Sequence, residues 1–224
     1  KAEKNGWLPW ETFAGHKTLN LTAVLGGKWI ALASYCVRNN ITNEVPETAK
    51  IFIFDVAEGK IVKEYEPIKG ARKIGPMIET AAGKVVSIAP DPADKDGGLI
   101  FGMDIETGLV TFTCKLPVAV VGFPSGGAGT SEFVQAPDGS IWTYVAENSG
   151  ARFCTLVRFD PSTHEVRIVG RVLGRGPLAF SGADLYRGPV FEPGKLIRYR
   201  GVAALPRGCK RRHDAARRLL RSAA

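Results

Sequence analysis

The sequence predicts an all-β chain built from repeated four-stranded antiparallel sheets. Apolar strand segments are joined by glycine turns at Gly27, Gly83 and Gly139, which lie 56 residues apart. A second hairpin, whose turn begins at an aspartate, follows each of these glycine turns. The apolar period of about 3.6 residues that an amphipathic helix needs is not sustained anywhere before residue 210. These three observations together favour strands over helices throughout the body of the chain.

The first hairpin of each repeat is an apolar strand, a glycine turn and a second apolar strand. It spans residues 21–32, 77–88 and 133–144, and a weaker fourth copy spans residues 178–186. Tight hairpin turns need a positive φ, which glycine adopts without a steric clash. Because the glycine recurs at the same place within each copy, the sequence predicts a hairpin at each position.

The second hairpin covers residues 51–62, 100–110 and 156–166, with turns that start at Asp55, Asp104 and Asp160. Aspartate suits a turn start because its carboxylate can accept a hydrogen bond from the backbone two residues on. Asp55 follows its glycine by 28 residues, whereas the later aspartates follow theirs by 21. We expect the seven extra residues to lie in the polar stretch 38–49, because surface loops tolerate insertions.

Four short antiparallel strands per repeat of about 50 residues are the blade pattern of a β-propeller. The Asp-x-x-x-Gly hairpins at 55–61 and 104–110 resemble those of quinoprotein-like and YVTN-type propellers. The segment at 136–142 is similar to turns in NHL-repeat and lactonase-type propellers. The resemblance covers residues 18–200 and implies the architecture alone, because one fold serves many functions.

Three whole copies and one partial copy make about four blades, at the low end of the roughly four to eight that closed propellers use. An open arc of blades would leave sheet edges exposed. We therefore expect a partial propeller, which either further blades or self-association with a second chain would complete. A small closed four-bladed propeller is the alternative.

The sequence predicts three parts: an N-terminal segment at 1–17, the blades at 18–200 and a basic tail at 201–224. The net charge of +8 is concentrated at the end, because residues 195–224 hold ten Lys and Arg and a single acid, Asp214. The rest of the chain is nearly neutral. The tail is open to two interpretations, a short basic amphipathic helix or a disordered terminus. Contact with nucleic acid or a membrane surface is expected only through it.

Composition excludes several classes of protein. With 45% apolar residues the chain can bury a core, unlike a disordered chain. No run approaches the roughly 18 apolar residues of a membrane helix, so we expect no transmembrane segment. The four cysteines are too far apart for a zinc site.

The chain starts at Lys1 without a charged-then-apolar leader. The compartment stays open, with a secreted or periplasmic location favoured over the cytoplasm.

Loop lengths place any binding site at one end of the blades. If the strands of each blade are labelled A to D, the A–B and C–D turns are minimal, and we call their end the short-turn end. The B–C loops (38–49, 90–98, 147–151) and the D–A connections (66–76, 117–131, 172–177) meet at the other end, the long-loop end. Binding residues concentrate on loops that a rigid scaffold presents, so we expect the site there.

The D–A connections carry five basic residues that we take as candidate ligand-binding groups: Lys69, Arg72, Lys73, Arg171 and Arg175. They would ring a central funnel and receive a carboxylate or a phosphate, arginine through its bidentate fork. The same charges would equally be ordinary solvated surface groups.

Two metal- or phosphate-like motifs are incomplete. Asp91, Asp94 and Asp96 resemble the start of a calcium loop, but Pro92 intrudes and no glutamate follows at the twelfth position. The glycine-rich stretch 122–131 lacks the lysine and the following helix of a phosphate loop. We therefore predict a plain turn at the aspartates, a flexible D–A connection at 122–131 and no metal site.

The sequence shows no nucleophile with its base, no carboxylate pair and no metal cluster of the kind that enzymes use. His16, Glu79 and Glu132 are weak catalytic candidates as acid–base groups. The leading hypothesis is a non-catalytic propeller module that recognises a protein, or an anionic small molecule or saccharide, at the long-loop end. The alternative is a secreted, lactonase-like hydrolase or lyase that uses these three residues with a divalent metal cofactor.

Overall fold

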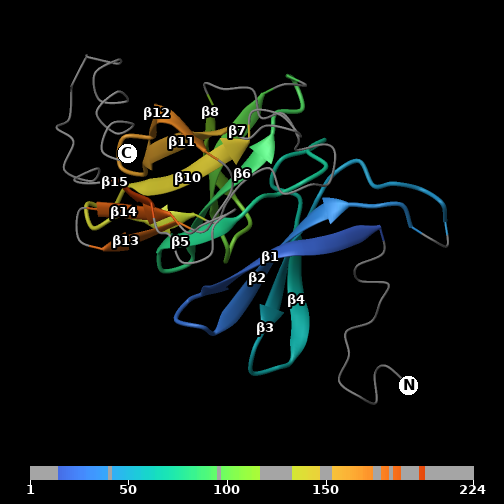
Figure 1. Ribbon diagram of the computed structural model, residues 1–224. Helices are drawn as coiled ribbons and strands as arrows, with labels where there is room; N and C mark the ends of the chain where they lie inside the picture. The colour runs from blue at the N-terminus through green and yellow to red at the C-terminus, as the bar shows by residue number, and fades with distance from the viewer. Residues whose placement is uncertain are drawn as a thin grey trace. The chain divides into compact units, whose positions relative to one another are not determined.

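A computed structural model describes the chain over residues 15–39, 42–94, 97–116, 133–146, 153–173, 178–181, 184–187 and 197–199. The regular elements described there are all β-strands (Figure 1). In this part of the chain no helix has the length and apolar character needed to cross a membrane. Residues 1–14 of the predicted N-terminal segment 1–17, and the whole predicted tail 201–224, lie outside the described residues.

The strands form four sheets, which we call blades 1 to 4. Blade 1 contains β1 (His16–Val24), β2 (Trp29–Cys36), β3 (Ile51–Asp55) and β4 (Lys60–Tyr65). Blade 2 contains β5 (Met77–Ala81), β6 (Lys84–Pro90), β7 (Gly98–Asp104) and β8 (Val110–Lys115). Blade 3 contains β9 (Val134–Gln135), β10 (Ile141–Ala146), β11 (Phe153–Asp160) and β12 (Glu165–Leu173). Blade 4 contains the described strands β13 (Leu178–Ser181), β14 (Asp184–Arg187) and β15 (Ile197–Tyr199).

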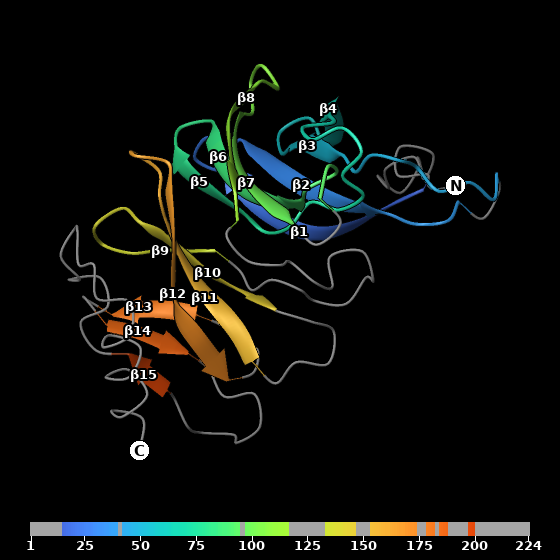
Figure 2. The same ribbon diagram turned by 90° about the horizontal axis from the view of Figure 1, so that it is seen from above.

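Within every sheet the strands lie in chain order, and each pairs antiparallel with the next. This up-and-down arrangement of four strands is that of a propeller blade. The predicted all-β fold of four-stranded propeller blades is therefore confirmed, and the chain is built of β-propeller blades. The strands fall into two compact units, β1–β8 and β9–β15 (Figure 2).

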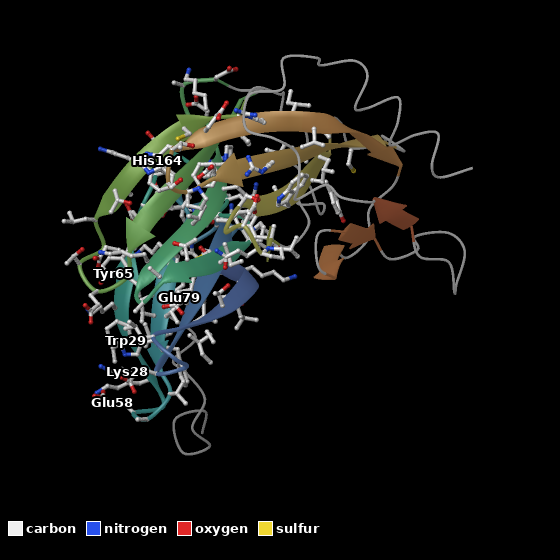
Figure 3. The ribbon with its side chains drawn as sticks, turned by 90° about the vertical axis from the view of Figure 1, so that its left-hand side faces the viewer. Lys28, Trp29, Glu58, Tyr65, Glu79 and His164 are labelled. Atoms are coloured by element: carbon white, nitrogen blue, oxygen red, sulfur yellow. The ribbon has the colours of Figure 1, made fainter. Side chains whose placement is uncertain are left out.

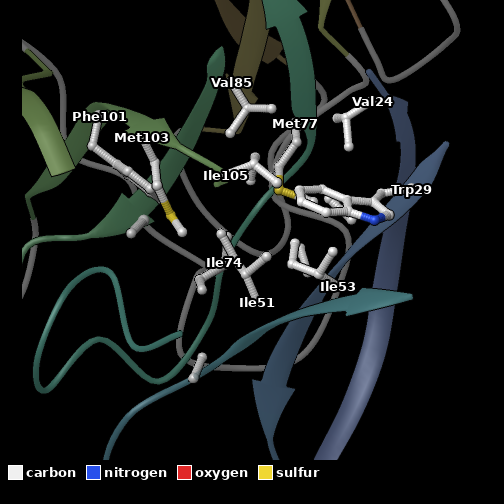
Figure 4. Packing of buried hydrophobic residues seen from close by; sticks show 14 of the residues in the cluster. Val24, Trp29, Ile51, Ile53, Ile74, Met77, Val85, Phe101, Met103 and Ile105 are labelled. Atoms are coloured by element: carbon white, nitrogen blue, oxygen red, sulfur yellow. The ribbon is translucent and has the colours of Figure 1, made fainter. Parts of the chain in front are cut away.

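Blades 1 and 2 share one apolar core. It is lined from blade 1 by Trp29, Ala31, Ala33, Ile51 and Ile53, and from blade 2 by Met77, Val85, Phe101, Met103 and Ile105 (Figure 4). All of these side chains are buried. Burying a single side chain of isoleucine or methionine size stabilises a fold by roughly 1.5–3 kcal/mol. The core that the two sheets share therefore contributes to the stability of this unit.

The first hairpins differ in turn length although their glycines are evenly spaced. Val24 pairs with Trp29 in blade 1, which leaves four residues in the turn. Ala81 pairs with Lys84 in blade 2, which leaves two, and Gln135 pairs with Ile141 in blade 3, which leaves five. The glycines thus recur at a constant interval in the sequence, but the strands that they join do not pair in the same register from blade to blade.

The aspartate turns have the predicted hydrogen bonds. Asp55 Oδ1 accepts from the backbone N–H groups of Ala57 and Glu58, both at 2.9 Å. Asp104 Oδ1 accepts from the two equivalent N–H groups of its own turn at 2.9 Å, and Asp160 Oδ1 accepts from Ser162 N at 3.0 Å. The bond from the Glu58 N–H contributes most to keeping the pKa of Asp55 below its usual value.

Candidate functional site

The long-loop end of the first unit is organised by the D–A connection 66–76, which we call the strap. The strap continues the sheet beside the last residues of β2, where β3 no longer pairs. Cys36 N donates to Arg72 O at 2.8 Å, and Ile74 N donates to Ser34 O at 2.9 Å. A bridge between Tyr35 and Lys73 lies between these two bonds. The end of β2 is therefore held between the start of β1 on one edge and the strap on the other.

Further bonds tie the strap to both blades. Ala49 N donates to Ala71 O at 2.7 Å, and Gly70 N donates to Thr48 Oγ1 at 2.9 Å, so the B–C loop of blade 1 holds its middle. Gly75 N donates to Ile88 O of blade 2 at 2.7 Å. Because so many of its backbone groups are paired within the protein, the strap is a fixed platform for the side chains that it carries.

The strap presents two of the predicted basic residues to solvent and buries the third. Lys69 and Arg72 are exposed, and neither forms an ion pair within the described part of the chain. Lys73 is only 5% exposed. Arg171 belongs to β12 of the other unit, and Arg175 lies outside the described residues. Lys69 and Arg72 are thus two exposed cations of one short segment.

Two other cations near this end are already engaged by neighbouring side chains, Arg38 by an amide and Lys50 by two carboxylates. Arg38 Nη1 donates to Asn43 Oδ1 at 2.8 Å. Lys50 Nζ lies 3.3 Å from Glu64 Oε2 and 3.9 Å from Glu66 Oε1. These contacts distinguish Lys50 and Arg38 from the two outward-facing groups of the strap.

His16 begins β1 at the long-loop end, but its side chain is only 9% exposed. Its Nδ1 lies 3.4 Å from Ser34 Oγ, and its ring meets the ring of Phe52 edge-on with centroids 5.9 Å apart. Burial, followed by the positive charge of Lys50, lowers the pKa of His16 below 6.5. The imidazole is therefore neutral at neutral pH.

Glu79 lies at the short-turn end, away from His16. Its Oε1 accepts hydrogen bonds from Leu25 N and from Gly83 N, both at 2.8 Å, and so joins the A–B turns of blades 1 and 2 (Figure 3). Leu25 follows the last residue of β1, whereas His16 is the first. At about 3.3 Å per residue, His16 and Glu79 are separated by roughly 30 Å. The two residues do not share a reaction centre, and Glu132 lies outside the described residues.

The aspartate-rich loop of blade 2 closes on itself. Asp91 Oδ1 accepts from Ala93 N at 2.9 Å, and Asp91 N donates to Gly97 O at 3.1 Å. Lys115 Nζ approaches Asp91 Oδ2 at 3.6 Å. Across the described residues, no three or more side chains of histidine, cysteine, aspartate or glutamate converge as a metal site would require. Asp96 and the glycine-rich stretch 122–131 lie outside them.

Sequence reasoning missed the side chains that bind the turns of the neighbouring blade. The Tyr65 hydroxyl donates to Ile105 O at 3.0 Å, and Lys63 Nζ donates to Glu106 O at 2.6 Å. Lys63 Nζ also lies 4.8 Å from the ring centroid of Trp29. Each contact joins residues that are far apart in the chain, so no local pattern could have revealed it. The bonds of Tyr65 and Lys63 join β4 of blade 1 to the C–D turn of blade 2, and so hold the two blades together at the short-turn end.

The comparisons with known proteins bear on the fold. No family model matches the chain, and no curated protein matches it in sequence. Among solved structures it is similar to TolB from Acinetobacter baumannii (16% identity, TM-score 0.48), with 82% of this chain and 40% of that chain covered. It is similar also to the Dos1 propeller (8% identity, TM-score 0.46; 77% of this chain and 42% of that chain). A third similar structure is Kuenenia stuttgartiensis hydrazine synthase (12% identity, TM-score 0.44; 77% and 61%). The chain thus spans about two to three fifths of the length of these proteins.

Proposed function

We propose that this chain is a non-catalytic binding module that recognises an anionic group, carried by a protein, a small molecule or a saccharide, at the long-loop end. The observation that supports the proposal is the pair of exposed cations, Lys69 and Arg72, on a strap whose backbone is fixed by both blades.

A fixed backbone favours binding because less conformational freedom is lost when a ligand is held. Arg72 offers a planar fork that matches a carboxylate or a phosphate with two hydrogen bonds, and Lys69 adds a compact point charge. Since no carboxylate among the described residues forms an ion pair with either cation, we take their charge as available to a ligand. Lys73 would support the site from beneath, and Arg171 and Arg175 would extend it if the second unit brings them to the same end.

The hydrolase alternative gains no support from the described residues. It needs His16 and Glu79 to act on one bond or to hold one metal, and roughly 30 Å of extended strand separates them. His16 is also largely buried, which limits its access to a substrate.

Calorimetric titration with three probes, inorganic phosphate, citrate and poly-L-glutamate, tests the binding proposal. We expect at least one probe to bind, with an affinity that falls as salt is added. Lys69→Glu/Arg72→Glu should weaken that binding at least tenfold, because it replaces attraction by repulsion at both positions.

Lys60→Glu is the matched control, because Lys60 is an exposed cation of the short-turn end whose Nζ pairs with Glu58 at 2.9 Å. It should change the affinity less than twofold, since surface pairs of this kind contribute little. The proposal fails if none of the probes binds the wild-type protein, or if Lys60→Glu weakens binding as much as the double substitution.

A further inference from the structure

Ser34 is the point at which three segments of the long-loop end meet. Its backbone N–H donates to Lys50 O at 3.0 Å, and its carbonyl accepts from Ile74 N of the strap at 2.9 Å. Its Oγ accepts from Lys50 N at 2.9 Å and lies 3.4 Å from His16 Nδ1. Ser34 is fully buried. The start of β1, the B–C loop and the strap are thus joined through one residue.

The protonation state of His16 decides how this junction is bonded. The Ser34 hydroxyl has one proton, and its oxygen already accepts the Lys50 N–H. With the imidazole proton on Nε2, Nδ1 is an acceptor and receives that hydroxyl proton. A second proton on the ring turns Nδ1 into a donor, which can bond only to the remaining lone pair of Ser34 Oγ, so the hydroxyl proton loses its acceptor inside a buried site.

The charges around His16 act in both directions. Lys50, at the end of the B–C loop, disfavours a positive ring, while Glu64 and Glu66 favour it but are each held by Lys50 Nζ. Arg72 and Lys73 are the cations of the neighbouring strap, and neither is among the charges that shift the pKa of His16. On β2, burial raises the pKa of Cys36 to about 11, so its thiol supplies no negative charge at neutral pH, and Tyr35 is the other titratable residue there. A protonated His16 would therefore be buried, beside Lys50 and two carboxylates that Lys50 already holds, and burial is the largest cause that opposes its charge.

We propose that His16 is a pH-sensitive latch, which holds the start of β1 and the strap on the end of β2 while its ring is neutral and releases them when the ring is protonated. The inference does not depend on the proposed binding function. It concerns the strap that carries Lys69 and Arg72, so a released latch would also loosen the backbone on which those residues are mounted.

The direction of the effect follows from linkage. The docked state holds the pKa of His16 below 6.5, so the opened state takes up the proton first as the pH falls. The docked state is unaffected above about pH 7 and loses stability as the pH falls through 6.5. At pH 5.5, one unit below 6.5, opening is favoured by up to about tenfold.

Hydrogen–deuterium exchange of the full chain at pH 7.4 and pH 5.5, corrected for intrinsic exchange, tests the latch. In the wild-type protein, peptides from residues 15–24 and 66–76 should exchange several-fold faster at the lower pH. His16→Gln, which does not titrate, should remove this difference. His164→Asn should keep it, because His164 is an exposed residue of the β11–β12 turn whose positive φ of 56° asparagine tolerates.

Equal protection of both segments at the two pH values in the wild-type protein would overturn the latch, and so would an undiminished pH difference in His16→Gln. An NMR titration of the wild-type imidazole signals gives a second test that needs no variant. The ring of His16 should titrate below 6.5, and titration of His16 at or above 6.5 would contradict the proposal.

Discussion

At the residue scale, Glu79 shows how a polar side chain that looks catalytic in the sequence can serve the fold. One carboxylate oxygen accepts the N–H groups of Leu25 and Gly83, which belong to turns of two different blades. Without that oxygen, both N–H groups lose their partner, and each unsatisfied donor costs about 1–3 kcal/mol when shielded from water.

We predict that Glu79→Ala lowers the free energy of unfolding by about 2 kcal/mol and that Glu79→Gln, which keeps an acceptor oxygen, lowers it by less than half as much. Urea unfolding measures both values. Glu106→Ala is the control, because Glu106 is an exposed carboxylate at the same end, and it should have little effect. An equal loss for Glu106→Ala and Glu79→Ala would show that the two bonds are unimportant.

Cys36 illustrates how burial determines the reactivity of a thiol. Although Arg72 lies close enough to favour the thiolate, burial has the larger effect and raises the pKa of Cys36 to about 11. At pH 8 the folded protein then has about one thiolate per thousand Cys36 side chains.

We predict that iodoacetamide modifies Cys36 roughly a hundredfold more slowly in the folded protein than in urea at the same pH. Peptide mass spectrometry over a time course gives both rates. The rate in urea controls for the reagent and the local sequence. Comparable rates in the two conditions would mean that the thiol is not shielded as the structure indicates.

At the element scale, the C–D turns of blades 1 and 2 form a natural pair of test sites. Gly59 and Gly108 both adopt a left-handed backbone, with φ of 65° and 77°. An added Cβ at Gly59 would meet no atom within 4 Å, whereas one at Gly108 would collide with the ring of Tyr65. The two positions therefore separate the cost of backbone strain from the cost of a clash.

We predict that Gly59→Ala destabilises the fold by about 1 kcal/mol through its backbone alone. Gly108→Ala should cost about 3 kcal/mol, because the Tyr65 ring must also leave its hydrogen bonds to the turn. Thermal and urea unfolding measure the difference. If the two variants are equally stable, Tyr65 does not pack on the turn as described.

The elements themselves were predictable because their patterns are local. Two such patterns are the alternation of Thr and apolar residues in β8 and the aspartates at 55, 104 and 160. Each acts within a few residues of the chain, so strand and turn follow from the sequence.

The register was not predictable in the same way. The first hairpins of blades 1, 2 and 3 have turns of four, two and five residues, and pairing across the sheet decides which residue faces Asp55 or Asp104.

At the scale of the whole molecule, the basic charge and the candidate site are separate features. Ten Lys and Arg fall within residues 195–224, while the rest of the chain is nearly neutral. Electrostatic attraction to polyanions is therefore expected to come from the end of the chain, and recognition of a specific anionic group from the strap.

We predict that removal of residues 201–224 lowers the salt concentration needed to elute the protein from heparin, because the deletion removes seven Lys and Arg with one Asp. The double variant at Lys69 and Arg72 should elute closer to wild type than the truncated protein does. If truncation leaves the elution unchanged, the tail does not govern non-specific binding.

The candidate site was predictable only in part. Loop lengths alone indicated the long-loop end and the residues Lys69, Arg72 and Lys73, since the positions of turns can be counted along the chain. They did not indicate that Lys73 is buried while Lys69 and Arg72 are exposed, because burial depends on how the strap docks beside β2. The separation of His16 from Glu79 depends likewise on the direction of β1 and on which turns Glu79 joins.

The sequence by itself determined the strand-rich repeat, the aspartate turns and the uneven distribution of charge, because each depends on neighbouring residues or on simple counting. Only the tertiary structure decided what distant segments do to one another. In the folded chain Glu79 binds the turns of two blades, and Lys69 and Arg72 lie on a strap whose backbone is hydrogen-bonded to its neighbours. His16 packs against Ser34 and Phe52. The physical reason is that burial, hydrogen-bond partners and the pKa values that follow from them are set by contacts between residues far apart in the chain.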